Sequence, residues 1–221
     1  MKTKDRIIAE SLRLFNEQGE RMVSTNHIAA ALGISPGNLY YHFRNKEAII
    51  AALFEEMASR FETLLADGSD AALDLPRLFA FLDGLFENLW HYRFFNRNLA
   101  HVLSRDPPLA LQYRAYAERM QAYMHRLLAS LQSQGILLIA AEDIDPLVEN
   151  AWLIGTFWLN YQETAYPEAA ITEATVRSGI LQLLHLFKTY LHPDAQLLYG
   201  HLIAYYTQPG SGPVHALASS A

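Results

Sequence analysis

The chain has 221 residues, of which 51% are apolar, so it can build a sizeable core in one large or two small domains. It contains no cysteine, which excludes a disulfide framework and a thiolate metal site. The net charge of −6 is unevenly distributed: residues 1–50 carry 7 Lys and Arg against 5 Asp and Glu, whereas the remainder carries 10 against 18. A basic head on an acidic body is compatible with one end of the molecule meeting phosphate.

The sequence favours a cytoplasmic protein. Its N-terminal segment has no apolar stretch followed by a small-residue cleavage site, so we expect no secretory signal. No run of 18 apolar residues occurs, so we expect no membrane span.

The hydrophobic spacing is helical almost throughout, which predicts an all-α fold. Ser24 and Ser35 are suited to capping helix starts, and Gly19 and Gly33 to ending helices. Together with later Pro, Asp and Thr starts, these positions predict helices at about 4–18, 25–32, 36–43, 46–67, 74–90, 94–104, 106–134, 145–165, 172–191 and 193–206. The segment 136–142 is expected to be a loop or a short helix.

The helices 25–32 and 36–43 are joined by a tight turn around Gly33, as in a helix-turn-helix. The second helix of this motif enters the DNA major groove. Leu39 and Phe43 lie four residues apart and should be buried. The residues expected to face DNA are Ser35, Pro36, Gly37, Asn38, Tyr40, Tyr41 and His42, with Lys46 adding charge at the start of the next helix. Tyr41 suits packing of the domain equally well.

The stretch "VSTNHIAAALGISPGNLYYHFRNKEAII" resembles the DNA-binding domain of the TetR family of bacterial transcriptional regulators. The residues that carry the resemblance are Thr25, Ile28-Ala29, Gly33-Ile34-Ser35, Gly37, Leu39-Tyr40, Tyr41-His42-Phe43 and Lys46-Glu47. The resemblance covers about residues 4–50. It implies an all-helical protein that dimerises through its C-terminal domain and a repressor that a small molecule releases from its operator, although activators occur among relatives.

The resemblance also assigns roles by position. Ser24, Thr25 and Asn26 match the start of the first helix of the motif, which touches the DNA backbone or bases. Residues 36–38 and Tyr40 match the recognition helix, and His42 and Lys46 match phosphate contacts. Asn26 departs from relatives that carry Arg here, which implies a different operator sequence.

The rest of the chain has aromatic residues at helical spacing but no catalytic constellation. There is no nucleophile elbow, no paired metal-ligand motif and no phosphate loop, so we expect neither an enzyme nor a metal or cofactor. Apolar pockets between the helices of a bundle commonly bind ligands. The candidate ligand-binding residues are Trp90, Phe94, Arg97, Asn98, His101, Tyr113, Tyr123, Trp152, Phe157 and Asn160.

Two late helices are candidates for a homodimer interface, at about 146–164 and 173–191. "AWLIGTFWLNY" is hydrophobic nearly all round, so we expect it to be buried on every side. Gly155 and Gly179 would allow close helix approach. In the resembled family the last two long helices form a four-helix dimer bundle.

The sequence therefore predicts three parts: a helix-turn-helix domain at 1–50 with the helix 46–67 as connector, a helical regulatory and dimerisation domain at 51–207, and a disordered tail at 208–221. The predicted function is a repressor that binds a palindromic double-stranded DNA operator until a small, largely apolar effector binds. Two alternatives remain: a DNA-binding architectural or partner-recruiting protein without an effector, and a helical enzyme or carrier.

Overall fold

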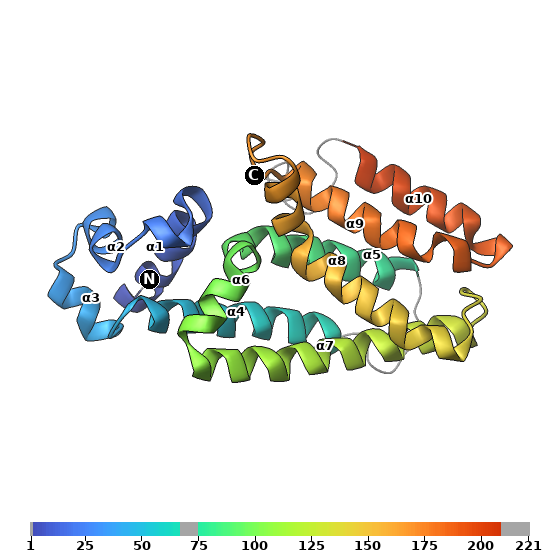
Figure 1. Cartoon of the computed structure of the whole chain (residues 1–221), viewed down its shortest axis with the longest axis horizontal. Coiled ribbons are helices and arrows are strands. Elements are labelled where there is room, and N and C mark those ends of the chain that lie inside the picture. Colours follow the sequence, from blue (N-terminus) through green and yellow to red (C-terminus); the bar gives the residue numbers. More distant parts are fainter. Residues whose placement is uncertain (1, 67–74, 209–221) are drawn as a thin grey trace. The chain divides into compact units, whose positions relative to one another are not determined.

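The computed structural model describes residues 2–66 and 75–208, and nearly every element in these ranges is helical (Figure 1). The α-helices are α1 (Thr3–Gln18), α2 (Thr25–Leu32), α3 (Pro36–His42), α4 (Lys46–Ala66), α5 (Leu75–His91), α6 (Arg93–Arg105), α7 (Pro107–Ser133), α8 (Ile144–Ala165), α9 (Glu173–Phe187) and α10 (Gln196–Thr207). Short 3-10 helices are η1 (Glu20–Met22), η2 (Ala141–Asp143), η3 (Lys188–Tyr190) and η4 (Pro193–Ala195). The predicted all-α class is confirmed.

The segment after α7 contains the one strand-like pairing in the described residues, a single antiparallel bridge between Leu137 and Leu191. The N–H of Leu138 donates to the carbonyl of Tyr190 at 2.6 Å, and the N–H of His192 donates to Ile136 at 3.0 Å. The segment predicted as a loop or short helix is thus a bridged loop that ends in η2.

The chain divides into two compact units, and the division differs from the predicted boundary at residue 50. The first unit is Met1–Arg60 with Tyr92–Tyr113, and the second is Phe61–His91 with Arg114–Ala221. The break falls within α4, and α6 belongs to the same unit as the helix-turn-helix. The predicted tail, apart from its first residue, lies outside the described residues, as does the predicted stop of α4 at residue 67.

The first unit is held together by an aromatic cluster that joins helices far apart in sequence. The ring of Phe15 on α1 lies 5.2 Å from that of Phe94 on α6, and Phe54 on α4 stacks on Phe95 at 5.4 Å. The side chain of Asn16 accepts a hydrogen bond from the N–H of Phe94 at 3.1 Å, which satisfies a free donor in the first turn of α6. These long-range contacts explain why α6 joins this unit.

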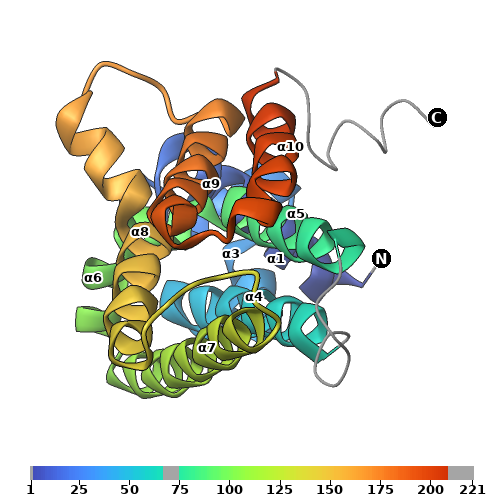
Figure 2. The same ribbon diagram turned by 90° about the vertical axis from the view of Figure 1, so that its right-hand side faces the viewer.

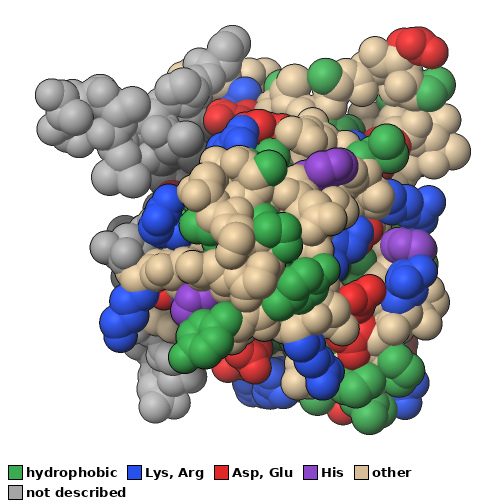
Figure 3. Space-filling model, turned by 90° about the vertical axis from the view of Figure 1, so that its left-hand side faces the viewer, with side chains coloured by type: hydrophobic (Ala, Val, Ile, Leu, Met, Phe, Trp, Pro, Cys, Tyr) green, Lys and Arg blue, Asp and Glu red, His purple; other side chains and the backbone are tan. Residues whose placement is uncertain are grey.

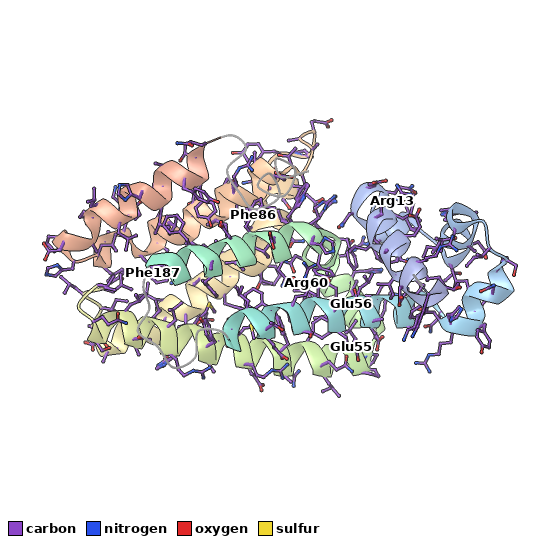
Figure 4. The ribbon with its side chains drawn as sticks, turned by 180° about the vertical axis from the view of Figure 1, so that it is seen from behind. Arg13, Glu55, Glu56, Arg60, Phe86 and Phe187 are labelled. Atoms are coloured by element: carbon purple, nitrogen blue, oxygen red, sulfur yellow. The ribbon has the colours of Figure 1, made fainter. Side chains whose placement is uncertain are left out.

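One core cluster of the second unit lies mainly between α5, α9 and α10, which lie side by side in Figures 1 and 2, and another joins α7 to the start of α8. Phe86 on α5, labelled in Figure 4, is almost completely buried, and the guanidinium of Arg177 lies 6.0 Å from its ring. Asp83 accepts hydrogen bonds from the hydroxyls of Tyr206 at 2.6 Å and Tyr205 at 3.2 Å. Within the described ranges, the helices include none with the length and apolar character needed to cross a membrane.

A close contact between α8 and α9 depends on a glycine. A Cβ added at Gly179 would come within 2.7 Å of Trp158, so only glycine leaves room for the indole. The indole N–H of Trp158 in turn donates to the carbonyl of Thr175 at 2.8 Å. The close approach predicted at Gly179 thus occurs within one chain, whereas a Cβ at Gly155 would meet nothing within 4 Å.

Candidate nucleic-acid interface

The turn between α2 and α3 has a fixed hydrogen-bonded geometry. Gly33 adopts φ +65°, the left-handed conformation that side chains disfavour. Its N–H donates to the carbonyl of Ala30 at 3.1 Å, and the N–H of Ile34 donates to Ala29 at 3.0 Å. Ser35 then caps α3 by accepting from the N–H of Asn38 at 3.2 Å, with Pro36 in the first helical position. The predicted helix-turn-helix geometry is therefore present.

The seven-residue helix α3 is too short to be stable alone, so tertiary packing must hold it. Leu39 is fully buried, and Phe43, which follows the helix, is 5% exposed. The N–H of Phe43 donates to the carbonyl of Leu39 at 2.9 Å. Both residues are core, as predicted, and they fix which face of α3 turns outward.

The outer face of α3 carries the residues predicted to meet DNA. Tyr41 is 85% exposed, Tyr40 is 48% exposed, and residues 36–38 are exposed as well. The ring of His42 is half-buried and lies edge-on to that of Tyr41 at 5.1 Å. The structure thus answers the question left open for Tyr41, which does not pack into the domain. Figure 3 views this end of the first unit, where exposed hydrophobic side chains lie among Lys, Arg, Asp and Glu side chains.

The start of α2 is tied to α3 by a side-chain hydrogen bond. The hydroxyls of Thr25 and Tyr40 lie 3.0 Å apart. Ser24 caps α2 by accepting from the N–H of His27 at 3.3 Å, while its own N–H donates to Nδ1 of His27 at 3.4 Å. Asn26 is exposed beside them. The residues predicted on the two helices of the motif are therefore brought to one region.

Lys46 has a different environment from the one that sequence predicts. Its Nζ lies 2.7 Å from the Oε1 of Glu20 and donates to the carbonyl of Glu20 at 2.9 Å. The Glu20 side chain is 4% exposed and that of Lys46 is 22% exposed, so this is a largely buried ion pair. The single turn of η1 places Glu20 there, and sequence spacing offered no sign of the pairing. The ammonium predicted to bind phosphate is thus engaged inside the protein.

Five of the residues predicted to bind ligand lie in the first unit. Phe94 is core, and Tyr113 packs near Phe54 and Phe95 at 6.2 Å. The amide of Asn98 donates to the carbonyl of Phe94 at 2.8 Å, and Arg97 is half-buried. His101 lines a small cleft, whose walls are Glu20, Glu47, Ile50, His101, Val102, Arg105, Asp106 and Leu109.

The other five, Trp90, Tyr123, Trp152, Phe157 and Asn160, lie in the second unit. The ring of Tyr123 lies 5.7 Å from Phe81, and burial raises the pKa of its hydroxyl. Trp152 lies 6.5 Å from Tyr116. Phe157 instead is 43% exposed, which separates it from the half-buried aromatics. In the part of the chain that the structure describes, no group of three His, Asp or Glu side chains is arranged to hold a metal ion.

Comparison with known proteins places both ends of the chain in one family. Residues 7–53 match the family model described as "Bacterial regulatory proteins, tetR family", and residues 54–199 match that described as "Bacterial transcriptional repressor". A solved TetR-family transcriptional regulator from Marinobacter aquaeolei VT8 is 40% identical, with a TM-score of 0.85 over 95% of this chain and all of that one.

Curated relatives match mainly at the N-terminal end. The tetracycline repressor class A of Escherichia coli is 40% identical over 57 residues, which are 26% of this chain and 26% of that protein. The negative regulator IcaR of the Staphylococcus epidermidis biofilm operon is 32% identical over 79 residues, 36% of this chain and 43% of its own length. The chain thus spans less than half the length of these two relatives.

Proposed function

Because the chain belongs to the TetR family of bacterial transcriptional regulators, we propose that it is a dimeric repressor that binds a palindromic operator and leaves it when a small apolar ligand binds. Members of this family are DNA-binding regulators, not enzymes. The observation that carries the proposal is α3: its buried Leu39, with the buried Phe43 just after the helix, leaves a polar and aromatic face outward.

The proposed DNA contacts come from both helices of the motif. Small residues at the start of α3 allow the backbone to approach the major groove, and Asn38 can hydrogen-bond base edges. Tyr40 is held in position by Thr25, so its hydroxyl reaches phosphate with little loss of side-chain entropy. The remaining contacts are Ser24, Asn26, Ser35, Tyr41 and His42.

The proposed dimer interface is on α8 and α9. Leu153, Phe157 and Tyr161 occur at intervals of four residues on α8, and all are more than 40% exposed. The sequence favours burial of this helix on every side, and packing against a second copy of the chain would bury these three exposed side chains. Two recognition helices about 34–36 Å apart would then read a palindrome.

The proposed effector site uses the half-buried aromatics of the second unit, Trp90, Tyr123 and Trp152, with Asn160 as a polar group. Such a site is apolar with few hydrogen-bonding groups, which suits a largely apolar ligand. A ligand that binds the form with incorrectly spaced recognition helices weakens DNA binding, and DNA weakens ligand binding by the same factor.

Binding to DNA from the region upstream of its own gene tests the proposal. We expect saturable fluorescence anisotropy that random-sequence DNA competes poorly. Asn38→Ala should alter the sequence preference, whereas Gln112→Ala, at an exposed position on α7, should not. Equal affinity for every duplex, unchanged by Asn38→Ala, would contradict specific recognition. Thermal shifts with a panel of apolar compounds then separate a ligand-responsive repressor from a regulator without an effector.

A further inference from the structure

The charges of the first 50 residues are sorted by ion pairs, two within α1 and one between η1 and α4. Of the seven Lys and Arg residues, Arg13 forms ion pairs with Glu10 and Glu17 on α1, and Lys46 forms the buried pair with Glu20. Arg13 is labelled on α1 in Figure 4. Most of the acidic charge in this region is therefore used by two cations.

The other five cations are all exposed, and none forms an ion pair within the described residues: Lys2, Lys4, Arg6, Arg21 and Arg44. The remaining acids do little to balance them. Glu47 lies 3.8 Å from Arg105, and Asp5 accepts a hydrogen bond from the backbone N–H of Lys2 at 3.1 Å. The net charge here stays +2, because Arg13 pairs with two acids, but the pairing changes how the charge is distributed and leaves these five cations without an ion-pair partner among the described residues.

Some of these cations lie next to the recognition helix. The Nζ of Lys4 is 5.7 Å from the centre of the Phe43 ring, and Phe43 directly follows α3. Arg44 is the next residue and is exposed. The guanidinium of Arg6 donates to the carbonyl of Leu32 at 3.3 Å, at the end of α2. The first turn of α1 thus carries two cations, Lys4 next to the end of α3 and Arg6 at the end of α2.

The carboxyl of Glu56 interacts only weakly with Lys4. Burial is the largest influence on Glu56 of α4, labelled in Figure 4, and it raises the pKa of that carboxyl; Arg60 and, least of all, Lys4 oppose it. Lys4 can therefore meet a phosphate without leaving a strong partner. Lys46 cannot, because a Lys46 ammonium turned toward DNA would leave the buried Glu20 carboxylate without its partner.

Resting on the proposed function, we propose that Lys4 and Arg44, together with Lys2 at the N-cap of α1, bind operator phosphates at the end of the recognition helix. They take the role that family resemblance predicts for Lys46, which instead anchors the start of α4 to η1. Each such contact releases counterions from DNA, so each should contribute to the salt dependence of binding and little to sequence preference.

Salt titrations of DNA binding test this assignment. The probes are a duplex enriched from a random pool by the wild-type protein and an unrelated duplex of the same length, each measured by anisotropy from about 50 to 200 mM salt. The variants are Lys2→Gln/Lys4→Gln, Arg44→Gln and Glu20→Gln/Lys46→Met. Arg13→Gln is the matched control, because it removes one charge that is already paired.

Log K falls as log salt rises, so the slope is negative. Removing one phosphate-binding charge from each subunit of a dimer should make this slope less steep by about 1.8. We expect this decrease in steepness for Arg44→Gln and a larger decrease for Lys2→Gln/Lys4→Gln, and both decreases should be the same on the two duplexes. Arg13→Gln and Glu20→Gln/Lys46→Met should keep the wild-type slope. The double variant removes both members of the buried ion pair, so no unpaired charge is left inside the protein and it can fold.

The outcomes separate this inference from the proposed function. A wild-type protein that enriches no duplex from the random pool contradicts the proposed function itself. Specific wild-type binding, with Lys2→Gln/Lys4→Gln and Arg44→Gln slopes equal to that of Arg13→Gln, overturns the inference alone. If Glu20→Gln/Lys46→Met remains folded by circular dichroism but shows a less steep slope than wild type, Lys46 is a phosphate contact and the inference is wrong.

Discussion

Two helices expose aromatic side chains, and their surroundings differ. On α3, Tyr40 and Tyr41 are exposed, the hydroxyl of Tyr40 lies within hydrogen-bonding distance of Thr25, and the exposed Arg44 follows the helix closely. On α8, Phe157 and Tyr161 form a stripe with Leu153, and the helix has no Lys or Arg. Exposed aromatic residues thus have two meanings. Where polar groups and positive charge surround them they suit nucleic acid, and where an apolar stripe continues them they suit another protein surface.

The two helices also differ in how they are held. The short α3 depends on two buried anchors and on a fixed turn, so small changes in the first unit should alter its position. The 22-residue α8 is held by packing along its length, including the Trp158–Gly179 contact. Substitutions should therefore affect DNA binding through the first unit and assembly through the second.

The largest effect is expected from Glu20→Ala. It leaves the Lys46 ammonium partly buried without a counter-charge, which should destabilise the first unit by about 3 kcal/mol. All three tryptophans lie outside this unit, so amide hydrogen exchange of α1–α3 is the suitable measurement. Glu17→Ala, at an exposed surface pair, is the control. Equal protection of the amides from hydrogen exchange in both variants would show that the buried ion pair does not stabilise the first unit.

The next effect concerns the stripe on α8. Phe157→Glu places a charge in the proposed dimer interface and should raise the dimer dissociation constant by about 100-fold, or about 2.8 kcal/mol. Sedimentation velocity measures it, with Leu111→Glu, an exposed leucine on α7, as the control. A Phe157→Glu protein that dimerises as tightly as wild type would move the interface elsewhere.

A smaller effect is expected inside the second unit. Tyr206→Phe removes the hydroxyl that donates to Asp83 at 2.6 Å and should cost about 1–2 kcal/mol, measured by urea unfolding with tryptophan fluorescence. Tyr166→Phe, at an exposed position, should change little.

The same tyrosine predicts a pH dependence. Burial, with Asp83 adding to it, raises the pKa of Tyr206 far above its ordinary value. The unfolded phenol ionises near pH 10 while the folded one stays protonated, so stability is complete below about pH 10 and falls as pH rises further. Tyr206→Phe should lose less stability between about pH 8 and 10.5 than wild type does. Equal alkaline losses would show that Tyr206 is not the group responsible.

The smallest effect concerns how α2 holds the outer face of α3. Tyr40→Phe removes the hydrogen bond to Thr25 and should weaken operator binding roughly fivefold, about 1 kcal/mol. Thr25→Val breaks the same bond, so the double variant should bind little worse than either single one. Fully additive losses would mean that the two hydroxyls act on DNA independently.

Several elements were predictable because their signals are local. Ser24 and Gly33 mark the two ends of α2, Ser35 and Pro36 mark the start of α3, and the structure has the predicted boundaries of both helices within one residue. Leu39 and Phe43 were recognisable as core from their spacing alone. Capping, left-handed turns and helical periodicity depend on neighbours within four residues, so they can be predicted from the sequence alone.

Other features depend on contacts across long sequence distances. The membership of α6 in the first unit follows from the Asn16–Phe94 bond, between residues 78 positions apart. The ten predicted ligand residues are divided between the two units, because helical spacing marks aromatic faces but not what covers them.

The sequence by itself determined the all-helical class, the helix-turn-helix and its outward face, because these follow from local capping and periodicity. Only the tertiary structure decided which charges remain available. It paired Lys46 with Glu20 across 26 residues, whereas Arg13 pairs within α1 with residues three and four positions away, and Lys4 and Arg44 stay open. Charge composition is additive along a chain, but the surface charge that a partner meets depends on which opposite charges the fold brings within contact.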